Sequence, residues 1–118
     1  MIGVDQSLTS TGVCVFMEGK LIDTHVISTK PNKDDPLDVF HRSADIAAQI
    51  MQILWTYYVF DVTLEGLSYG SVSSSTRKLA TLQAYIVDRV LTNGGKVTII
   101  EPTRLKKFAT GKGNANKD

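Results

Sequence analysis

Residues 2–17 read IGVDQSLTSTGVCVFM, and this stretch decides how the fold begins. A short apolar run at its start ends at Asp5, which is typical of a buried strand that carries an acid at its carboxyl end. The small polar residues 6–12 predict a turn, and the apolar residues 13–17 predict a second strand. A glycine-containing hairpin turn then leads into a third strand over residues 21–28. We therefore expect the chain to open as an antiparallel meander.

The remainder of the chain alternates between helices and strands. A long helix is indicated by apolar residues at spacings of three and four. These residues are Phe40, Ala44, Ala47, Met51, Leu54 and Tyr58. Residues 60–64 predict a fourth strand that ends at Glu65, residues 76–92 a second helix, and residues 96–100 a fifth strand. A short helix is expected over residues 101–108.

The order βββαβαβα predicts an α/β fold with a mixed five-stranded sheet flanked by helices, in which three antiparallel strands precede two parallel ones. Right-handed crossovers would place the fourth strand beside the first. Asp5 and Glu65 would then meet at one edge of the sheet, because the carboxyl ends of parallel strands lie together.

The composition is that of one globular domain. The chain has 118 residues, of which 42% are hydrophobic and 21% charged. No apolar run is long enough for a membrane span, and the first residues do not resemble a signal peptide. Cys14 is the only cysteine, so an internal disulfide is excluded and a reducing, cytoplasmic location is expected.

Charge is distributed unevenly along the chain. Residues 1–70 hold four Lys/Arg and nine Asp/Glu, whereas residues 71–118 hold nine Lys/Arg and three Asp/Glu, so the balances are −5 and +6. A basic half beside an acidic half indicates a polyanionic partner, although a solvated surface with accidental segregation explains the charges equally well.

Asp5 and Glu65 are the first candidates for chemistry. Two adjacent carboxylates repel one another unless a cation joins them, and Mg²⁺ prefers such oxygen ligands. For either acid alone, a helix cap or turn anchor is the better interpretation. For both together, with a basic C-terminal half, we favour a metal site that activates water for phosphodiester cleavage.

The polar residues 6–12 also allow a phosphate-binding loop, because small residues closed by glycine let backbone N–H groups approach a phosphate. The alternative is an ordinary hairpin rich in serine and threonine. The same residues resemble the first phosphate loop of actin-like and sugar kinases, which likewise starts with an aspartate at a strand end.

Three segments together resemble RuvC-type Holliday-junction resolvases, especially phage-encoded members, and hence the RNase H-like superfamily. Residues 2–12 (IGVDQSLTSTG) resemble the family's opening, and residues 63–66 (TLEG) its second acidic motif. Residues 111–118 (GKGNANKD) resemble the Gly-x-Gly-x-Ala-x-Lys loop before the last helix. The resemblance spans almost the whole chain in the right order.

The resemblance implies functions for individual residues. Asp5 and Glu65 match the first two metal-binding acids of a Mg²⁺- or Mn²⁺-dependent nuclease. Lys106, or the adjacent Lys107, matches a functional lysine before the glycine loop. Lys117 matches the catalytic lysine that contacts the scissile phosphate.

The expected DNA contacts lie mostly in the C-terminal half. Tyr69 lies near a family aromatic that stacks on bases at the junction. Arg77 and Lys78 open the second helix beside a serine-rich loop, where phosphate contact is slightly favoured over plain solvation. Lys112, with the lysines at 106 and 107, is expected to hold backbone phosphates, which makes affinity dependent on salt.

The family supplies its last metal ligands from a C-terminal helix, which would begin where this sequence reaches Asp118. Asp118 is expected to start that helix rather than to replace a ligand. We therefore expect a single RNase H-like nuclease domain over residues 1–118 without this helix. As it stands, the chain is expected to bind Mg²⁺ weakly and to cut poorly or not at all, unless the site is completed from elsewhere.

The second helix carries two apolar stripes, which is more than one sheet face can cover. One stripe is Leu79, Leu82, Ile86 and Val90, and the other is Ala80, Ala84, Val87 and Leu91. The spare stripe predicts a homodimer through this helix, as the resemblance also implies. The alternative is that the family's C-terminal helix covers it.

The leading hypothesis is a structure-selective, divalent-metal-dependent endonuclease that resolves four-way DNA junctions in recombination and repair, in the host cytoplasm if a phage encodes it. A second hypothesis is a catalytically incomplete module that only holds branched DNA. A third is a fragment of an actin-like ATPase, although such proteins need two domains around the nucleotide.

Overall fold

The computed structural model describes residues 1–67 and 73–101. Its elements are β1 (Ile2–Asp5), β2 (Ser10–Met17), β3 (Lys20–Ser28), α1 (Asp38–Tyr57), β4 (Asp61–Glu65), α2 (Ser74–Thr92) and β5 (Lys96–Ile100). This order confirms the expected succession up to the fifth strand. Residues 102–108 of the expected short helix lie outside the described residues.

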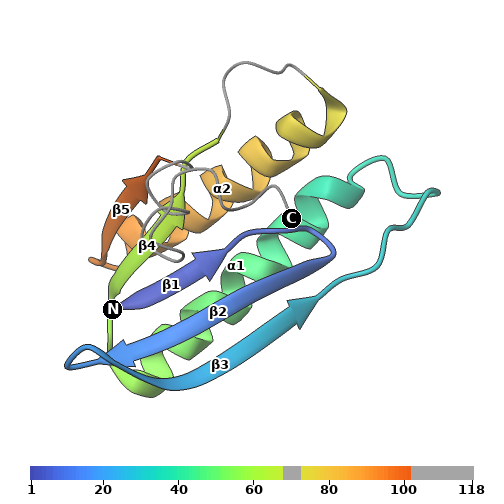
Figure 1. Ribbon diagram of the computed structural model, residues 1–118. Coiled ribbons are helices and arrows are strands. Elements are labelled where there is room, and N and C mark those ends of the chain that lie inside the picture. The colour runs from blue at the N-terminus through green and yellow to red at the C-terminus, as the bar shows by residue number, and fades with distance from the viewer. Residues whose placement is uncertain (68–72, 102–118) are drawn as a thin grey trace, which may run out of the picture.

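The strands form one sheet in the order β3-β2-β1-β4-β5. β1 pairs antiparallel with β2, and β2 with β3, whereas β1–β4 and β4–β5 are parallel. The predicted mixed sheet is therefore confirmed, and so is the placement of the fourth strand beside the first. Both helices lie on one face of this sheet, behind the strands in Figure 1.

The turn after β1 is shorter than the sequence suggested. We expected it to run over residues 6–12, but β2 begins at Ser10, and Ser10 to Gly12 pair with β3. Backbone hydrogen bonding does not depend on side-chain polarity, so a polar segment can still join a ladder when a neighbouring strand offers its backbone. The hydroxyl residue Thr11 is fully buried there.

The buried face of α1 differs partly from the predicted stripe. Ala47, Met51 and Leu54 are buried as expected, but Phe40 and Tyr58 are 47% and 76% exposed. Tyr58 lies beyond the end of the helix, as a left-handed C-cap with φ 54°. The core positions that we missed are Ser43, Ile46, Ile50 and Ile53.

α2 buries three of the four residues of one predicted stripe, and the fourth, Leu79, is half-buried. Leu82, Ile86 and Val90 have no exposed surface and pack in the core. The helix begins after Ser73, whose hydroxyl accepts a hydrogen bond of 3.1 Å from the Thr76 amide. Such a cap satisfies an N–H group that has no partner within the helix, and it stabilises the helix by about 1 kcal/mol.

The core lies between the sheet and the two helices. Strand residues alternate, so that Ile2 and Val4 of β1 and Val62 and Leu64 of β4 are buried.

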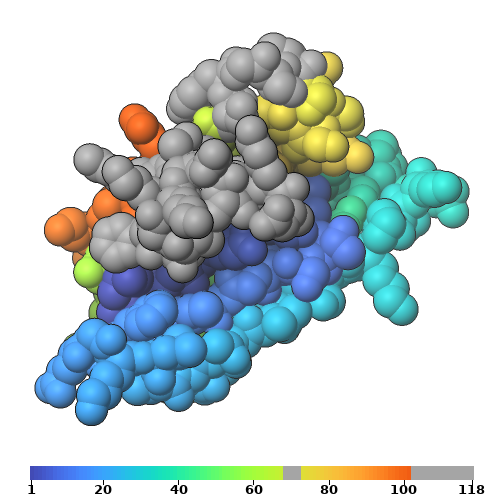
Figure 2. Space-filling model, in the orientation of Figure 1, coloured from blue at the N-terminus to red at the C-terminus, as the bar shows by residue number. Residues whose placement is uncertain are grey.

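In Figure 2 the blue β2–β3 hairpin and the yellow start of α2 lie at opposite sides of the visible face. Among the described residues, no helix has the length and apolar character that a membrane span needs.

Candidate metal and DNA site

Asp5 and Glu65 end the two neighbouring parallel strands at the centre of the sheet. The ladder pairs Gly3 with Thr63 and Val4 with Leu64, so each acid directly follows the last paired residue of its strand. Paired strands lie about 4.8 Å apart. The two acids are thus adjacent at one edge of the sheet, as the sequence predicted.

Both acids project from the sheet face opposite the helices. Val4 and Leu64 are buried against the helical layer, and successive strand residues point to opposite faces. Asp5 is exposed and Glu65 is half-buried, so water and ligands can reach both. Gly12 pairs with Asp5 on the other side, and a Cβ placed on it would be in ordinary van der Waals contact with the Asp5 Cβ at 3.8 Å.

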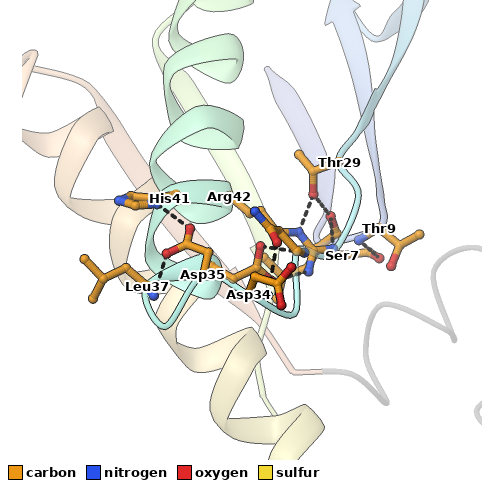
Figure 3. A network of polar contacts seen from close by, with 11 residues as sticks. Ser7, Thr9, Thr29, Asp34, Asp35, Leu37, His41 and Arg42 are labelled. Atoms are coloured by element: carbon orange, nitrogen blue, oxygen red, sulfur yellow. Dashed lines mark hydrogen bonds and ion pairs between the residues drawn. The ribbon is translucent and has the colours of Figure 1, made fainter.

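Arg42 of α1 holds the loop that follows Asp5 in place through hydrogen bonds and an ion pair (Figure 3). Its guanidinium donates to the Thr29 hydroxyl at 2.8 Å and to the Leu8 carbonyl at 3.2 Å. It also pairs with the Asp38 carboxylate at 3.2 Å, and both side chains are mostly buried. The Thr29 hydroxyl donates to the same Leu8 carbonyl. One side chain thus ties the loop to the end of β3 and the start of α1.

The backbone amides of this loop are already hydrogen-bonded within it. The Ser7 hydroxyl accepts from the Thr9 and Ser10 amides, each at 3.3 Å. The Ser7 amide donates to the Thr11 hydroxyl at 3.2 Å, and that hydroxyl donates to the Ser7 carbonyl. These three amides already have acceptors within the loop, which favours the hairpin interpretation over the phosphate loop. The serine and threonine residues close a hairpin.

The backbone of Glu65 is held by residues that the sequence analysis did not single out. Its carbonyl accepts hydrogen bonds from the side-chain amides of Gln6 and Gln83. The next amide, that of Gly66, donates to the Ile100 carbonyl at 2.7 Å. In the sequence, Gln6 directly follows the expected acid Asp5, and Gln83 lies on the otherwise apolar side of the second helix. These positions were the signal that could have pointed to them.

The donor set fits a divalent cation that keeps several waters, because two carboxylates supply hard oxygen ligands. Among residues 1–67 and 73–101, no group of three or more His, Cys, Asp or Glu residues could hold a metal ion. The site built from these residues is therefore a two-carboxylate site. The other predicted functional residues Tyr69, Lys106, Lys107, Lys112 and Lys117 lie outside the described residues.

Arg77 and Lys78 are exposed in the first turns of α2. Gln83 of the same helix reaches the Glu65 carbonyl, so this part of α2 lies beside the end of β4. Arg77 and Lys78 precede Gln83 by six and five residues, which amounts to about 9 and about 7.5 Å along a helix. Both cations therefore lie toward the sheet edge that carries the acids.

Asp23 and Tyr57 have shifted pKa values and lie away from the two acids. The Tyr57 hydroxyl donates to the Asp23 carboxylate and, with the Thr24 amide, lowers the pKa of Asp23, while this carboxylate raises the pKa of Tyr57. His25 lies 3.3 Å from the same carboxylate. These residues join β3 to the end of α1. We assign them a structural role.

The family model described as crossover junction endodeoxyribonuclease RuvC matches residues 1–118. Two solved structures are similar in fold. Thermus thermophilus RuvC has a TM-score of 0.75 and 22% identity, over 99% of this chain and 74% of that one. T. thermophilus RuvC in complex with a Holliday junction substrate has a TM-score of 0.75 and 20% identity, over 91% and 67%. A search of curated proteins gives no match.

Proposed function

Because this chain belongs to the crossover junction endodeoxyribonuclease RuvC family and has its RNase H-like fold, we propose that it resolves branched DNA through a metal site at Asp5 and Glu65. The family match makes it a junction-resolving, divalent-metal-dependent endonuclease. The observation that carries the proposed site is the parallel register of β1 and β4, which puts both acids at one sheet edge.

Asp5 and Glu65 would hold a divalent ion, for which we propose Mg²⁺ or Mn²⁺. Such an ion supplies a nucleophilic water and offsets charge on the phosphodiester. The protein's part is to keep the two carboxylates adjacent and accessible. Lys117 is proposed to offset negative charge that develops at the scissile phosphate.

The proposed DNA partner is a four-way junction, in line with the junction-bound structure that this fold matches. Arg77 and Lys78 are exposed at the start of α2, and we propose that they contact phosphates there. We further propose that Lys106, Lys107 and Lys112 hold the backbone. For Tyr69, the proposal is stacking on an unpaired base at the junction, a contact worth about 1–3 kcal/mol.

We also propose a homodimer through α2. Ala80, Ala84 and Leu91 of the second apolar stripe are exposed, and Val87 is half-buried. Alanines let a second helix approach closely, and a twofold axis would bring the same stripe from both copies together. Two copies would present two metal sites to the two symmetric strands of a junction. Covering by a further helix of the same chain is the alternative.

The two-carboxylate character of the described site favours a second candidate function, a domain that binds branched DNA and cuts it poorly. We propose that residues 1–118 form one RNase H-like nuclease domain and that further acidic ligands complete its metal site. The third hypothesis, an actin-like ATPase, is set aside because the family match covers the whole chain. The cytoplasmic location remains a prediction.

Cleavage of a synthetic four-way junction tests the proposed function. The chain, and a version extended by a C-terminal helix with two acids, are incubated with Mg²⁺ or Mn²⁺. The extended form should cut, and Asp5→Asn or Glu65→Gln should lower its rate at least about 100-fold, since outer partners of metal sites alone cost 10–100-fold. Full activity in both variants would disprove the metal site. Equal junction affinity in EDTA without cleavage would favour the binding module.

A further inference from the structure

We propose that Gln6 and Gln83 are positioning residues, which fix the end of β4 so that the Glu65 carboxylate stays in register with Asp5. The inference rests on the proposed metal site and adds to it two residues that do not touch the metal. Neither residue belongs to the acid pair or to the basic residues assigned to DNA.

The two glutamines share one acceptor. The Gln83 side-chain amide donates to the Glu65 carbonyl at 3.0 Å, and the Gln6 amide donates to it at 3.4 Å. A carbonyl oxygen has two lone pairs, so both acceptor positions of this group are used. The donors come from different directions, since Gln6 follows β1 and Gln83 lies in the middle of α2.

Glu65 needs such support because the β1–β4 ladder stops before it. The last paired residues are Val4 and Leu64. The Gln6 side chain supplies a donor where the β1 backbone no longer pairs with β4. On the opposite side, the Gly66 amide donates to the Ile100 carbonyl at 2.7 Å. The strand end is thus held by the loop after β1, by α2 and by β5.

This support affects the metal because the Glu65 side chain follows its backbone. Mg²⁺ requires nearly ideal octahedral geometry with oxygens at about 2.0–2.1 Å, so a small displacement of one carboxylate weakens binding. A fraying strand end would let Glu65 move relative to Asp5. Gln83 also connects the site to α2, which carries Arg77 and Lys78.

If Gln6 only stabilised the fold, its replacement would lower the free energy of unfolding. The Gln6 amide must turn its nitrogen to the Glu65 carbonyl, which leaves its Oε1 buried without a hydrogen-bond donor among residues 1–67 and 73–101. Gln6→Met removes one long hydrogen bond and one unsatisfied buried acceptor. We therefore expect unfolding stability to stay the same or rise in this variant, while metal affinity falls.

The test compares Gln6→Met and Gln83→Met with wild type. Gln52→Met, at an exposed position of α1, is the matched control. Mn²⁺ affinity is measured by water proton relaxation, and the free energy of unfolding by urea denaturation. The environment of the Glu65 carbonyl is followed by its ¹³C chemical shift in the metal-free protein. Asp5→Asn defines the background of Mn²⁺ binding. We expect Kd to rise about tenfold in both glutamine variants, as for outer-shell partners, and not in Gln52→Met.

The outcomes separate the two proposals. If wild type binds Mn²⁺ through Asp5 but both glutamine variants bind equally well, the positioning function is wrong and the metal site stands. If wild type shows no Asp5-dependent binding, the metal site fails and the positioning function fails with it. An unmoved ¹³C shift of the Glu65 carbonyl in Gln83→Met would also overturn the inference. Should Gln83→Met not fold, Gln6→Met alone decides.

Discussion

Replacing Arg42 by methionine should destabilise the protein strongly, although Arg42 lies outside the hydrophobic core. Methionine keeps most of the aliphatic stem but removes every donor. The variant loses hydrogen bonds to Thr29 at 2.8 Å, to Leu8 at 3.2 Å and to the Asp38 carboxylate at 3.2 Å. Because the Arg42 and Asp38 side chains are only 12% and 18% exposed, the carboxylate would be left without its cation in a mostly buried place.

The expected loss follows from these contacts. Breaking a buried ion pair by removing one partner costs about 3–5 kcal/mol. Asp38 lies near the surface and can regain water, so we take the lower limit, about 3 kcal/mol. For a domain of this size, about 4 °C is lost per kcal/mol, so the melting temperature should fall by about 12 °C.

Urea unfolding at pH 7, followed by circular dichroism, measures this loss. Arg89→Met on α2 is the matched control, since Arg89 is exposed in the last turn and its removal should cost at most about 1 kcal/mol. Arg42→Lys should recover part of the loss, because an ammonium can pair with Asp38 but cannot also reach Thr29 and Leu8 in a fork. Equal stability of Arg42→Met and Arg89→Met would refute the reasoning.

Three further predictions concern pH, salt and assembly. The Tyr57 hydroxyl lowers the pKa of Asp23, so this bond stabilises the fold above the unfolded pKa of Asp23, and its contribution is lost as pH falls through the lower folded value. Tyr57→Phe should therefore destabilise the protein more at pH 7 than at acidic pH in urea unfolding. Arg77→Ala and Lys78→Ala should each lower the slope of log affinity against log salt for a four-way junction by about 1, in fluorescence anisotropy; unchanged slopes would remove them from the interface. Leu91→Asp should shift the sedimentation coefficient from dimer to monomer, and an unchanged coefficient would contradict the α2 interface.

Much of the fold could be predicted because periodicity is a local property. The strand that ends at Asp5, the strand that ends at Glu65 and the helix between residues 74 and 92 were all indicated by spacing within a few residues. The adjacency of the two acids needed only one more step, the handedness of crossover connections. The motif resemblance then pointed to the family that the comparison found.

Other features depend on which segments meet in space. Periodicity could not exclude Phe40 from the buried face of α1, because Phe40 and Ile46 both fit an apolar stripe and only packing against the sheet selects between them. The hydroxyl residues after Asp5 allowed both a hairpin and a phosphate loop in the sequence, and only the folded loop shows that the Ser7 hydroxyl accepts from the Thr9 and Ser10 amides.

The sequence by itself determined the order of elements and the residue types at the two strand ends, since both are written in short, local patterns. Only the tertiary structure decided what holds those strand ends in place. Arg42 and Gln83 lie 34 and 18 residues from the backbone carbonyls of Leu8 and Glu65 that they bind. No short-range pattern encodes such a contact, because a backbone carbonyl is the same chemical group at every position and its partner is chosen by folding.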